Sequence, residues 1–170
     1  MLTGIYKSIV TIVLTVSGIS SLVAQTIASP DGYAGWQGTT GGGSTEPVVV
    51  STANEFRSAV SGSAPAVVIV NGRLDVGDVS IGSNKTVMGA NAQSGLYGGA
   101  IKIQGSNYII QNLIIGPHTD NDAVEVSGAK NVFIHKCEFY DGGDGNLDIV
   151  RASDYVTVSW CKFYYTDQTN

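Results

Sequence analysis

The segments Asn107-Tyr108-Ile109-Ile110 and Asn131-Val132-Phe133-Ile134 are similar to one another, and Tyr155-Val156-Thr157-Val158 follows after the same interval. All three are rich in β-branched and aromatic residues, which favour strands over helices. One interval earlier along the chain stands Asn84-Lys85-Thr86-Val87, with a spacing to Asn107 that is shorter by a single residue. A repeat of this length that is built from short strands is typical of a solenoid.

Two columns of apolar side chains repeat at the same interval as the strands. One contains Leu113, Cys137 and Cys161, and the other contains Ile115, Phe139 and Phe163. Equivalent side chains of successive coils stack inside a parallel β-helix, so we expect both columns to be internal. The leucine and asparagine consensus of leucine-rich repeats is absent from the sequence. The repeat therefore predicts an all-β parallel β-helix with about 23–24 residues per coil.

Asparagine and cysteine residues in the repeat lead to two more specific expectations. Asn107 and Asn131 are candidates for a hydrogen-bonded asparagine ladder at a corner of the coil. Cys137 and Cys161 stack in neighbouring coils, where a strand spacing of about 4.8 Å allows either two buried thiols or a disulfide. Both alternatives for the cysteines remain open on the sequence alone.

Short β-branched runs after Pro65 are the expected strands of the coils. They are 67–70, 86–88, 101–103, 108–115, 123–126, 132–135, 147–150 and 156–160. Residues 51–61 have the pattern of a short amphipathic helix, with Glu55 in a capping box. The Gly- and Ser-rich stretch 25–47 is either a flexible linker or an ordered loop lying on the core.

The N-terminus has the pattern of a secretory signal peptide over residues 1–24, which leaves 25–170 as one domain. Lys7 precedes an apolar run from Ile9 to Val16, and Ala24 is the expected last residue before cleavage. The apolar run is shorter than the roughly 20 residues that cross a bilayer, which favours secretion over a membrane anchor. We therefore expect a secreted, extracellular protein.

The charge of the chain restricts its partners. The formal net charge is −5 and there is no basic run, which argues against nucleic acid as a partner. A polyanionic substrate would also be repelled unless a cation or a local basic patch bridges it to the protein.

Four aspartates occupy positions that the repeat brings together, namely Asp120, Asp122, Asp144 and Asp148. Asp144 follows Asp120 by one coil of the repeat, and the same shift places Asp148 near Asp122. Like charges this close are unfavourable unless a cation neutralises them, and clustered carboxylates suit calcium better than zinc or copper. The alternative is that these aspartates only form turns, because the segments around them are also common turn sequences.

Several of these segments together resemble the secreted pectate and pectin lyases. The most specific runs from Asp144 to Trp160 and resembles DGLLDIKRGSDYVTVSW of that family, with Arg151 matching its arginine. Further matching segments are 38–43, 83–87, 107–115, 122–124 and 131–134. The resemblance extends from about residue 32 to residue 163.

This resemblance implies a right-handed, single-stranded parallel β-helix that cleaves α-1,4-linked polygalacturonate (pectate) by calcium-dependent β-elimination. The family's calcium positions map onto the same four residues, Asp120, Asp122, Asp144 and Asp148. The family's catalytic base is an arginine whose position would lie beyond Asn170. We therefore expect an incomplete lyase domain, a fragment truncated at its C-terminus, from a protein that is a monomer at full length.

Other functions fit the same residues. The chain could be a non-catalytic β-helix that binds acidic polysaccharide through calcium, or an inactive fragment of the lyase. A hydrolase of galacturonan would instead use two carboxylates as acid and base.

Overall fold

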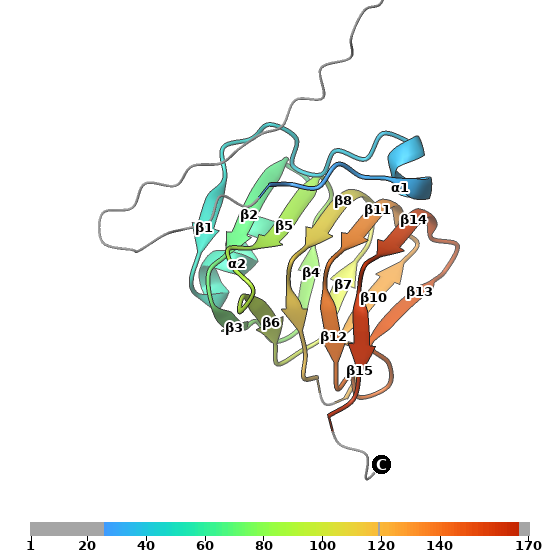
Figure 1. Cartoon of the computed structure of the whole chain (residues 1–170). Coiled ribbons are helices and arrows are strands. Elements are labelled where there is room, and N and C mark those ends of the chain that lie inside the picture. Colours follow the sequence, from blue (N-terminus) through green and yellow to red (C-terminus); the bar gives the residue numbers. More distant parts are fainter. Residues whose placement is uncertain (1–25, 119, 167–170) are drawn as a thin grey trace, which may run out of the picture.

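The computed structural model describes residues 26–118 and 120–166. Its strands form three parallel sheets that wind around one apolar core as a right-handed parallel β-helix (Figure 1). Each full coil contributes one strand to each sheet, so the chain passes from sheet to sheet at three corners. The fold class predicted from the repeat is confirmed.

The elements have the following bounds. The first sheet contains β1 (Val48–Val50), β2 (Ala66–Val70), β5 (Lys85–Gly89), β8 (Ser106–Gln111), β11 (Lys130–His135) and β14 (Asp154–Ser159). The second contains β4 (Val79–Ile81), β7 (Ile101–Ile103), β10 (Val124–Ser127) and β13 (Leu147–Val150). The third contains β3 (Arg73–Asp75), β6 (Gly95–Tyr97), β9 (Ile114–Ile115), β12 (Glu138–Tyr140) and β15 (Lys162–Tyr164). The helices are α1 (Gly32–Trp36) and α2 (Ala53–Val60).

The register of the sheets confirms the predicted repeat in the later coils. In the earlier coils, paired residues are separated by fewer residues than the repeat. Val132 pairs with Tyr108 on one side and with Val156 on the other, which is a shift of one full repeat in each direction. Val67 pairs with Thr86, and this shift is several residues shorter than the repeat. The length of a coil therefore varies with its connections, while the pairing of its strands does not.

The predicted apolar column at Ile115 is the centre of the core. Phe139 pairs with Ile115 and with Phe163, and the two phenylalanine rings stack with centroids 5.0 Å apart and planes 8° apart. Phe139 is fully buried, whereas Phe163 in the last strand is 48% exposed. Stacking of equivalent side chains therefore continues along the axis until the last described coil.

Corners of the coil are made by residues with a left-handed backbone. Asn84, Asn107 and Asn131 all have positive φ, and Tyr155 has the same conformation at the equivalent corner of the last coil. Asn107 Nδ2 donates to Asn84 Oδ1 at 2.9 Å, whereas Asn131 Nδ2 donates to the Gln37 carbonyl at 3.2 Å. The expected ladder thus joins Asn107 to Asn84, whereas the side-chain amide of Asn131 bonds to the N-terminal segment.

A similar corner divides one of the expected strands. The run 108–115 is broken into β8 and β9 at Asn112, whose φ of 53° turns the chain into the next sheet. Side-chain pattern alone does not show this break, because both strands are apolar and adjacent.

The Gly-rich stretch before α2 is an ordered loop that lies on the first sheet. Thr40 N and Gly41 N each donate to Asn107 Oδ1 at 2.8 Å, and Gly42 N donates to Thr86 Oγ1 at 3.0 Å. Of the two alternatives for this stretch, the ordered loop is therefore correct.

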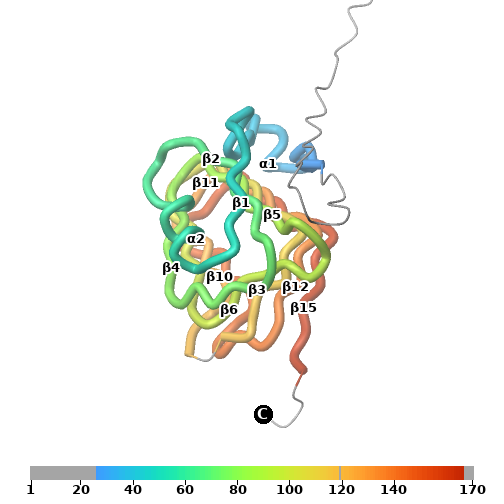
Figure 2. Tube along the Cα trace, turned by 90° about the vertical axis from the view of Figure 1, so that its left-hand side faces the viewer, coloured from blue at the N-terminus to red at the C-terminus, as the bar shows by residue number. Residues whose placement is uncertain are grey.

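The predicted helix is present as α2, and Figure 2 shows it at the N-terminal end of the coils. Its capping box joins Thr52 and Glu55, and Phe56 and Val60 are fully buried in the core. Within the described residues, no helix is long and apolar enough to cross a membrane. The expected signal peptide, residues 1–24, lies outside the described residues.

Phe139→Ala should lower the free energy of unfolding by about 3–5 kcal/mol, because it empties a fully buried position between two stacked neighbours. Phe163→Ala removes the same group from a half-exposed position and should cost much less. Urea denaturation followed by circular dichroism measures both. Equal losses for the two variants would contradict the stacking order described above.

Candidate functional site

The four predicted aspartates lie at one corner of the coil, where the chain enters the second sheet. Asp120 is exposed and Asp122 is half-buried, and both precede β10 on the neighbouring coil. Asp144 is exposed ahead of β13, and Asp148 is half-buried within that strand. The parallel sheet therefore gathers acidic side chains from two successive coils.

The alignment of the two acidic connections differs from the expected one. Gly143 N donates to Asn121 O at 3.0 Å, and Ala123 N donates to Gly145 O at 2.9 Å. These bonds place Asp144 beside Asp122, whereas the shift of one repeat predicted Asp120 as its neighbour. The prediction was wrong at this point because equivalent residues of the two acidic connections are separated by fewer residues than one full repeat.

Asp122 and Asp148 converge on the backbone of Gly145. A Cβ atom added at Gly145 would lie 2.6 Å from Asp122 Oδ1 and 3.2 Å from Asp148 Oδ1. Any side chain at this position would therefore displace the two carboxylates. The absence of a side chain at Gly145 leaves a space that both carboxylates face.

Asp122, Asp144 and Asp148 at the acidic corner have no ion-pair partner among the described residues. Burial raises the pKa of the Asp122 carboxyl, and the charges of Asp148, Asp144 and Glu125 raise that pKa further. In the part of the chain that is described, the ion pairs are Arg151–Glu125 and Lys162–Glu138, and neither includes Asp122, Asp144 or Asp148. The cluster is thus held together by the fold against its own repulsion.

The donor atoms at this corner suit a hard divalent cation. They are carboxylate oxygens without sulfur or imidazole, the set that calcium prefers. Among the described residues, however, no three His, Cys, Asp or Glu side chains are already gathered around one point as metal ligands. A cation would therefore require the exposed Asp120 and Asp144 side chains to turn toward Asp122 and Asp148.

Comparison with known proteins identifies the family. The family model described as pectate lyase matches residues 6–170. The chain belongs to the pectate lyase family. Curated relatives include a pectate trisaccharide-lyase from Thermotoga maritima, which is 31% identical over 79% of this chain and 40% of the relative. Pectate lyase A from Emericella nidulans is 37% identical over 75% of this chain and 43% of its own length.

Solved structures share the fold of this chain. A Bacillus subtilis pectate lyase variant has a TM-score of 0.70 at 18% identity, over 89% of this chain and 64% of that one. A pectate lyase from Bacillus sp. N165 in complex with trigalacturonate has a TM-score of 0.66 at 27% identity, over 80% of this chain and 54% of that one. The chain spans about two-fifths to just over half the length of the curated relatives it matches.

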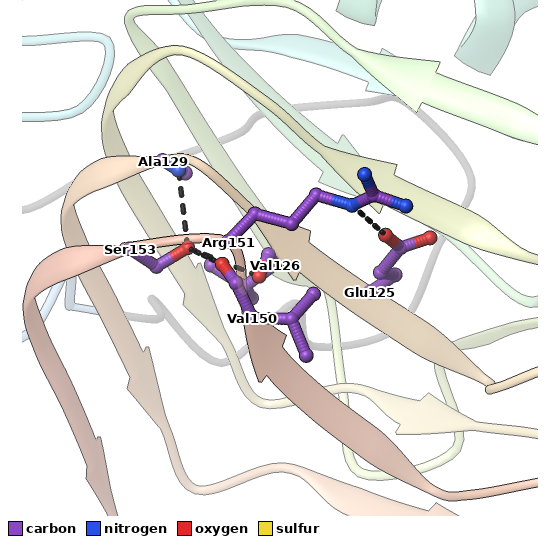
Figure 3. Close-up of polar contacts among 6 residues, drawn as sticks. All are labelled: Glu125, Val126, Ala129, Val150, Arg151 and Ser153. Carbon is purple, nitrogen blue, oxygen red and sulfur yellow. Dashed lines mark hydrogen bonds and ion pairs between the residues drawn. The ribbon is translucent and has the colours of Figure 1, made fainter.

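Glu125 also belongs to the acidic corner, although it was not among the residues predicted from the sequence. Glu125 pairs in register with Asp148 on one side and with Lys102 on the other, so their side chains project from the same face of the second sheet. Arg151 Nε lies 3.8 Å from Glu125 Oε1, as Figure 3 shows. The interval from Glu125 to Asp148 is almost one full repeat, and this interval is the signal in the sequence that relates the two residues.

Cys137 and Cys161 stack in neighbouring coils as expected and are present as free thiols. Burial raises the pKa of Cys137 well above its usual value, and the half-buried Cys161 then raises it further. The Cys137 thiol hydrogen bonds to Cys161 and is the main cause that lowers the pKa of Cys161 to about 7. The two thiols occupy equivalent positions in neighbouring coils, yet the pKa of Cys137 is raised and the pKa of Cys161 is lowered.

Asp122→Asn should stabilise the metal-free protein at neutral pH. The raised pKa means that the charged form of Asp122 is less favourable in the folded chain than in the unfolded chain. The advantage of the variant should shrink as the pH falls through the raised pKa to the usual range of an aspartate, because the wild-type carboxyl then becomes protonated. Thermal unfolding in a chelator between pH 3 and pH 7 measures this, because the range begins below the usual aspartate pKa of about 3.9.

Glu46→Gln removes an exposed carboxylate outside the acidic corner and is the matched control. It should leave the midpoint of unfolding unchanged over the same pH range. If Asp122→Asn is less stable than the wild type in chelator at neutral pH, the account of uncompensated charge is wrong.

Iodoacetamide at neutral pH should alkylate Cys161 and leave Cys137 unmodified in the folded protein, because only Cys161 is accessible and substantially ionised. The rate of labelling should rise with pH around a pKa of about 7. Peptide mass spectrometry identifies the labelled residue. Failure to label either cysteine until a reductant is added would instead indicate the disulfide.

Proposed function

We propose that the protein is a pectate lyase that cleaves polygalacturonate by calcium-dependent β-elimination. Membership of the family supports the reaction class. The observation that carries the proposal is the convergence of Asp122 and Asp148 on Gly145 without a basic partner among the described residues. An acidic protein repels a polyanion unless a cation or a local basic patch bridges the two, and this corner is suited to hold a cation.

The proposed ligands of calcium are Asp122, Asp144 and Asp148, with Asp120 as a fourth carboxylate at the edge of the corner. Calcium held by these residues would supply positive charge that offsets the aspartates and a uronate carboxylate, and would make the proton at C5 more acidic. Asp122 and Asp148 are half-buried, so they would fix the position of the bound cation. Asp120 and Asp144 are exposed and would complete the set of ligands from the solvent side. Gly145 keeps the space between the carboxylates open.

Two observations support polygalacturonate as the proposed substrate. The corner is acidic and suits a cation that could bind an acidic sugar, and the relatives are named pectate lyases. Two of the solved structures with this fold carry acidic or oligomeric sugars, a hexasaccharide in one and trigalacturonate in the other. We assign no catalytic base within residues 26–166.

We also propose that the protein is secreted, as expected for an enzyme whose substrate is an extracellular polymer. The support is the pattern of residues 1–24, where a lysine precedes a short apolar run and small residues.

The full protein, incubated with polygalacturonate and calcium, should release products that absorb ultraviolet light through a new carbon–carbon double bond. A chelator should abolish the release. Asp148→Asn should raise the calcium concentration for half-maximal rate at least tenfold, because loss of a direct ligand costs at least as much as loss of a supporting contact. Glu46→Gln should behave as the wild type.

Three results would contradict the proposal in different ways. Reducing ends without the unsaturated product would indicate a hydrolase. Calcium-dependent binding of polygalacturonate without any product would indicate a binding module. Unsaturated product that is unaffected by a chelator would exclude the role assigned to the aspartates.

A further inference from the structure

Arg73 in β3 lies along the outer face of the third sheet and reaches beyond the neighbouring strand. The third sheet runs from β3 through β6 and β9 to β12, and Figure 2 shows β3, β6 and β12 along its lower side. Gly95 in β6 is the register partner of Arg73, and a Cβ atom added there would lie 2.9 Å from Arg73 Nη1. Gly95 therefore leaves room for the Arg73 side chain to cross β6 toward β9 and β12.

The guanidinium of Arg73 is held by carbonyl oxygens, a hydroxyl and two aromatic rings. Arg73 Nη1 donates to Ile114 O at 3.4 Å, and Arg73 Nη2 donates to Gly116 O. Arg73 Nη2 also donates to Tyr140 Oη at 3.0 Å. The guanidinium carbon lies 5.6 Å from the centre of the Tyr97 ring and 5.8 Å from that of Tyr140, within the range of cation–π contacts. These contacts fix both the position and the plane of the guanidinium.

The contacts of Arg73 lie where the two acidic connections begin. Gly116 is the first residue after β9, and the connection from it to β10 carries Asp120 and Asp122. Tyr140 is the last residue of β12, and the connection from it to β13 carries Asp144. A single guanidinium therefore binds the base of both connections, although its own strand is two strands from β9 in the sheet.

The two acidic connections are also joined to each other beyond this base. His118 N donates to Asp141 O at 3.0 Å, and Gly143 N donates to Asn121 O at 3.0 Å. The His118 side chain is only 3% exposed, so it packs the first connection against the protein interior. Because backbone hydrogen bonds couple the connections, a displacement at their common base would change the separation of the carboxylates that they carry.

We propose that Arg73 is a positioning residue for the acidic corner, which it shapes by holding Gly116 O and Tyr140 Oη together. This rests on the proposed function, in which the carboxylates of the two connections bind calcium. A positive charge by itself opposes the binding of a cation, so Arg73 acts through geometry and not through its charge. Contacts that orient metal ligands commonly change metal affinity by about 10- to 100-fold.

Calcium binding to the full protein without polysaccharide, measured by isothermal titration calorimetry, tests this without requiring turnover. Arg73→Met should weaken calcium binding about tenfold, as expected for the loss of a contact that orients ligands. The loss of a positive charge alone would change the affinity in the opposite direction.

Tyr140→Phe is a milder variant, because it removes one hydroxyl and leaves the charge of Arg73 in place. It should weaken calcium binding about two- to threefold, as expected for one hydrogen bond. In the Arg73→Met background it should have no further effect. Only a role of the hydroxyl that acts through Arg73 gives this non-additive result.

Arg57→Met is the matched control. Arg57 on α2 also donates from its guanidinium to a backbone carbonyl, that of Val76, which lies outside both acidic connections. The variant removes the same charge and the same kind of contact as Arg73→Met. It should leave the affinity for calcium unchanged.

Hydrogen exchange of the metal-free protein in a chelator provides a second readout that does not depend on calcium. Arg73→Met should speed the exchange of the His118 and Gly143 amides about tenfold, because these amides join the two connections. Arg57→Met should leave the exchange of both amides as in the wild type.

The outcomes separate this inference from the proposed function. If the wild type binds no calcium, the proposed function is wrong and the inference falls with it. If the wild type binds calcium and neither Arg73→Met nor Tyr140→Phe weakens the binding, only the inference is wrong. Equal weakening by Arg57→Met would also overturn it, because the loss of affinity would then follow from lower stability. If Arg73→Met does not fold, Tyr140→Phe alone decides between these outcomes.

Discussion

In-register pairing of parallel strands is the constraint on which the rest of this molecule depends. The backbone N–H and C=O groups of each strand form hydrogen bonds with the strands of the coils before and after it. Equivalent residues of successive coils must therefore lie side by side. The column of Ile115, Phe139 and Phe163 follows directly from this pairing. The same pairing also brings like charges together, because the backbone hydrogen bonds align equivalent residues whether their side chains are apolar or acidic.

Much of the fold could be predicted from the sequence, because strand pairing repeats side-chain chemistry at a regular interval. This interval correctly placed Val132 between Tyr108 and Val156, and the capping residues correctly placed α2. What could not be predicted was the length of the connections between sheets. A corner forms where a residue such as Asn112 adopts a left-handed backbone conformation. The pattern of apolar residues around it does not indicate that conformation.

The same limit explains which parts of the site were predicted and which were not. The acidic residues were identified because aspartates recur on successive coils, but the neighbour of Asp144 was not, since it depends on a shortened connection. The contact between Glu125 and Arg151 could not be predicted for a different reason. It joins Glu125 in β10 to Arg151 in the turn that follows the neighbouring strand β13. The regular spacing of the repeat does not predict such a pair.

Connections at the corners have a consequence for how proteins of this architecture diversify. The connection from β9 to β10 carries Asp120 and Asp122, yet the register of the strands on either side does not depend on its length. Residues can be inserted into such a connection or deleted from it while the stacked strands keep their partners. Natural selection can therefore reshape the surface at one corner at a time, while the inherited framework stays the same.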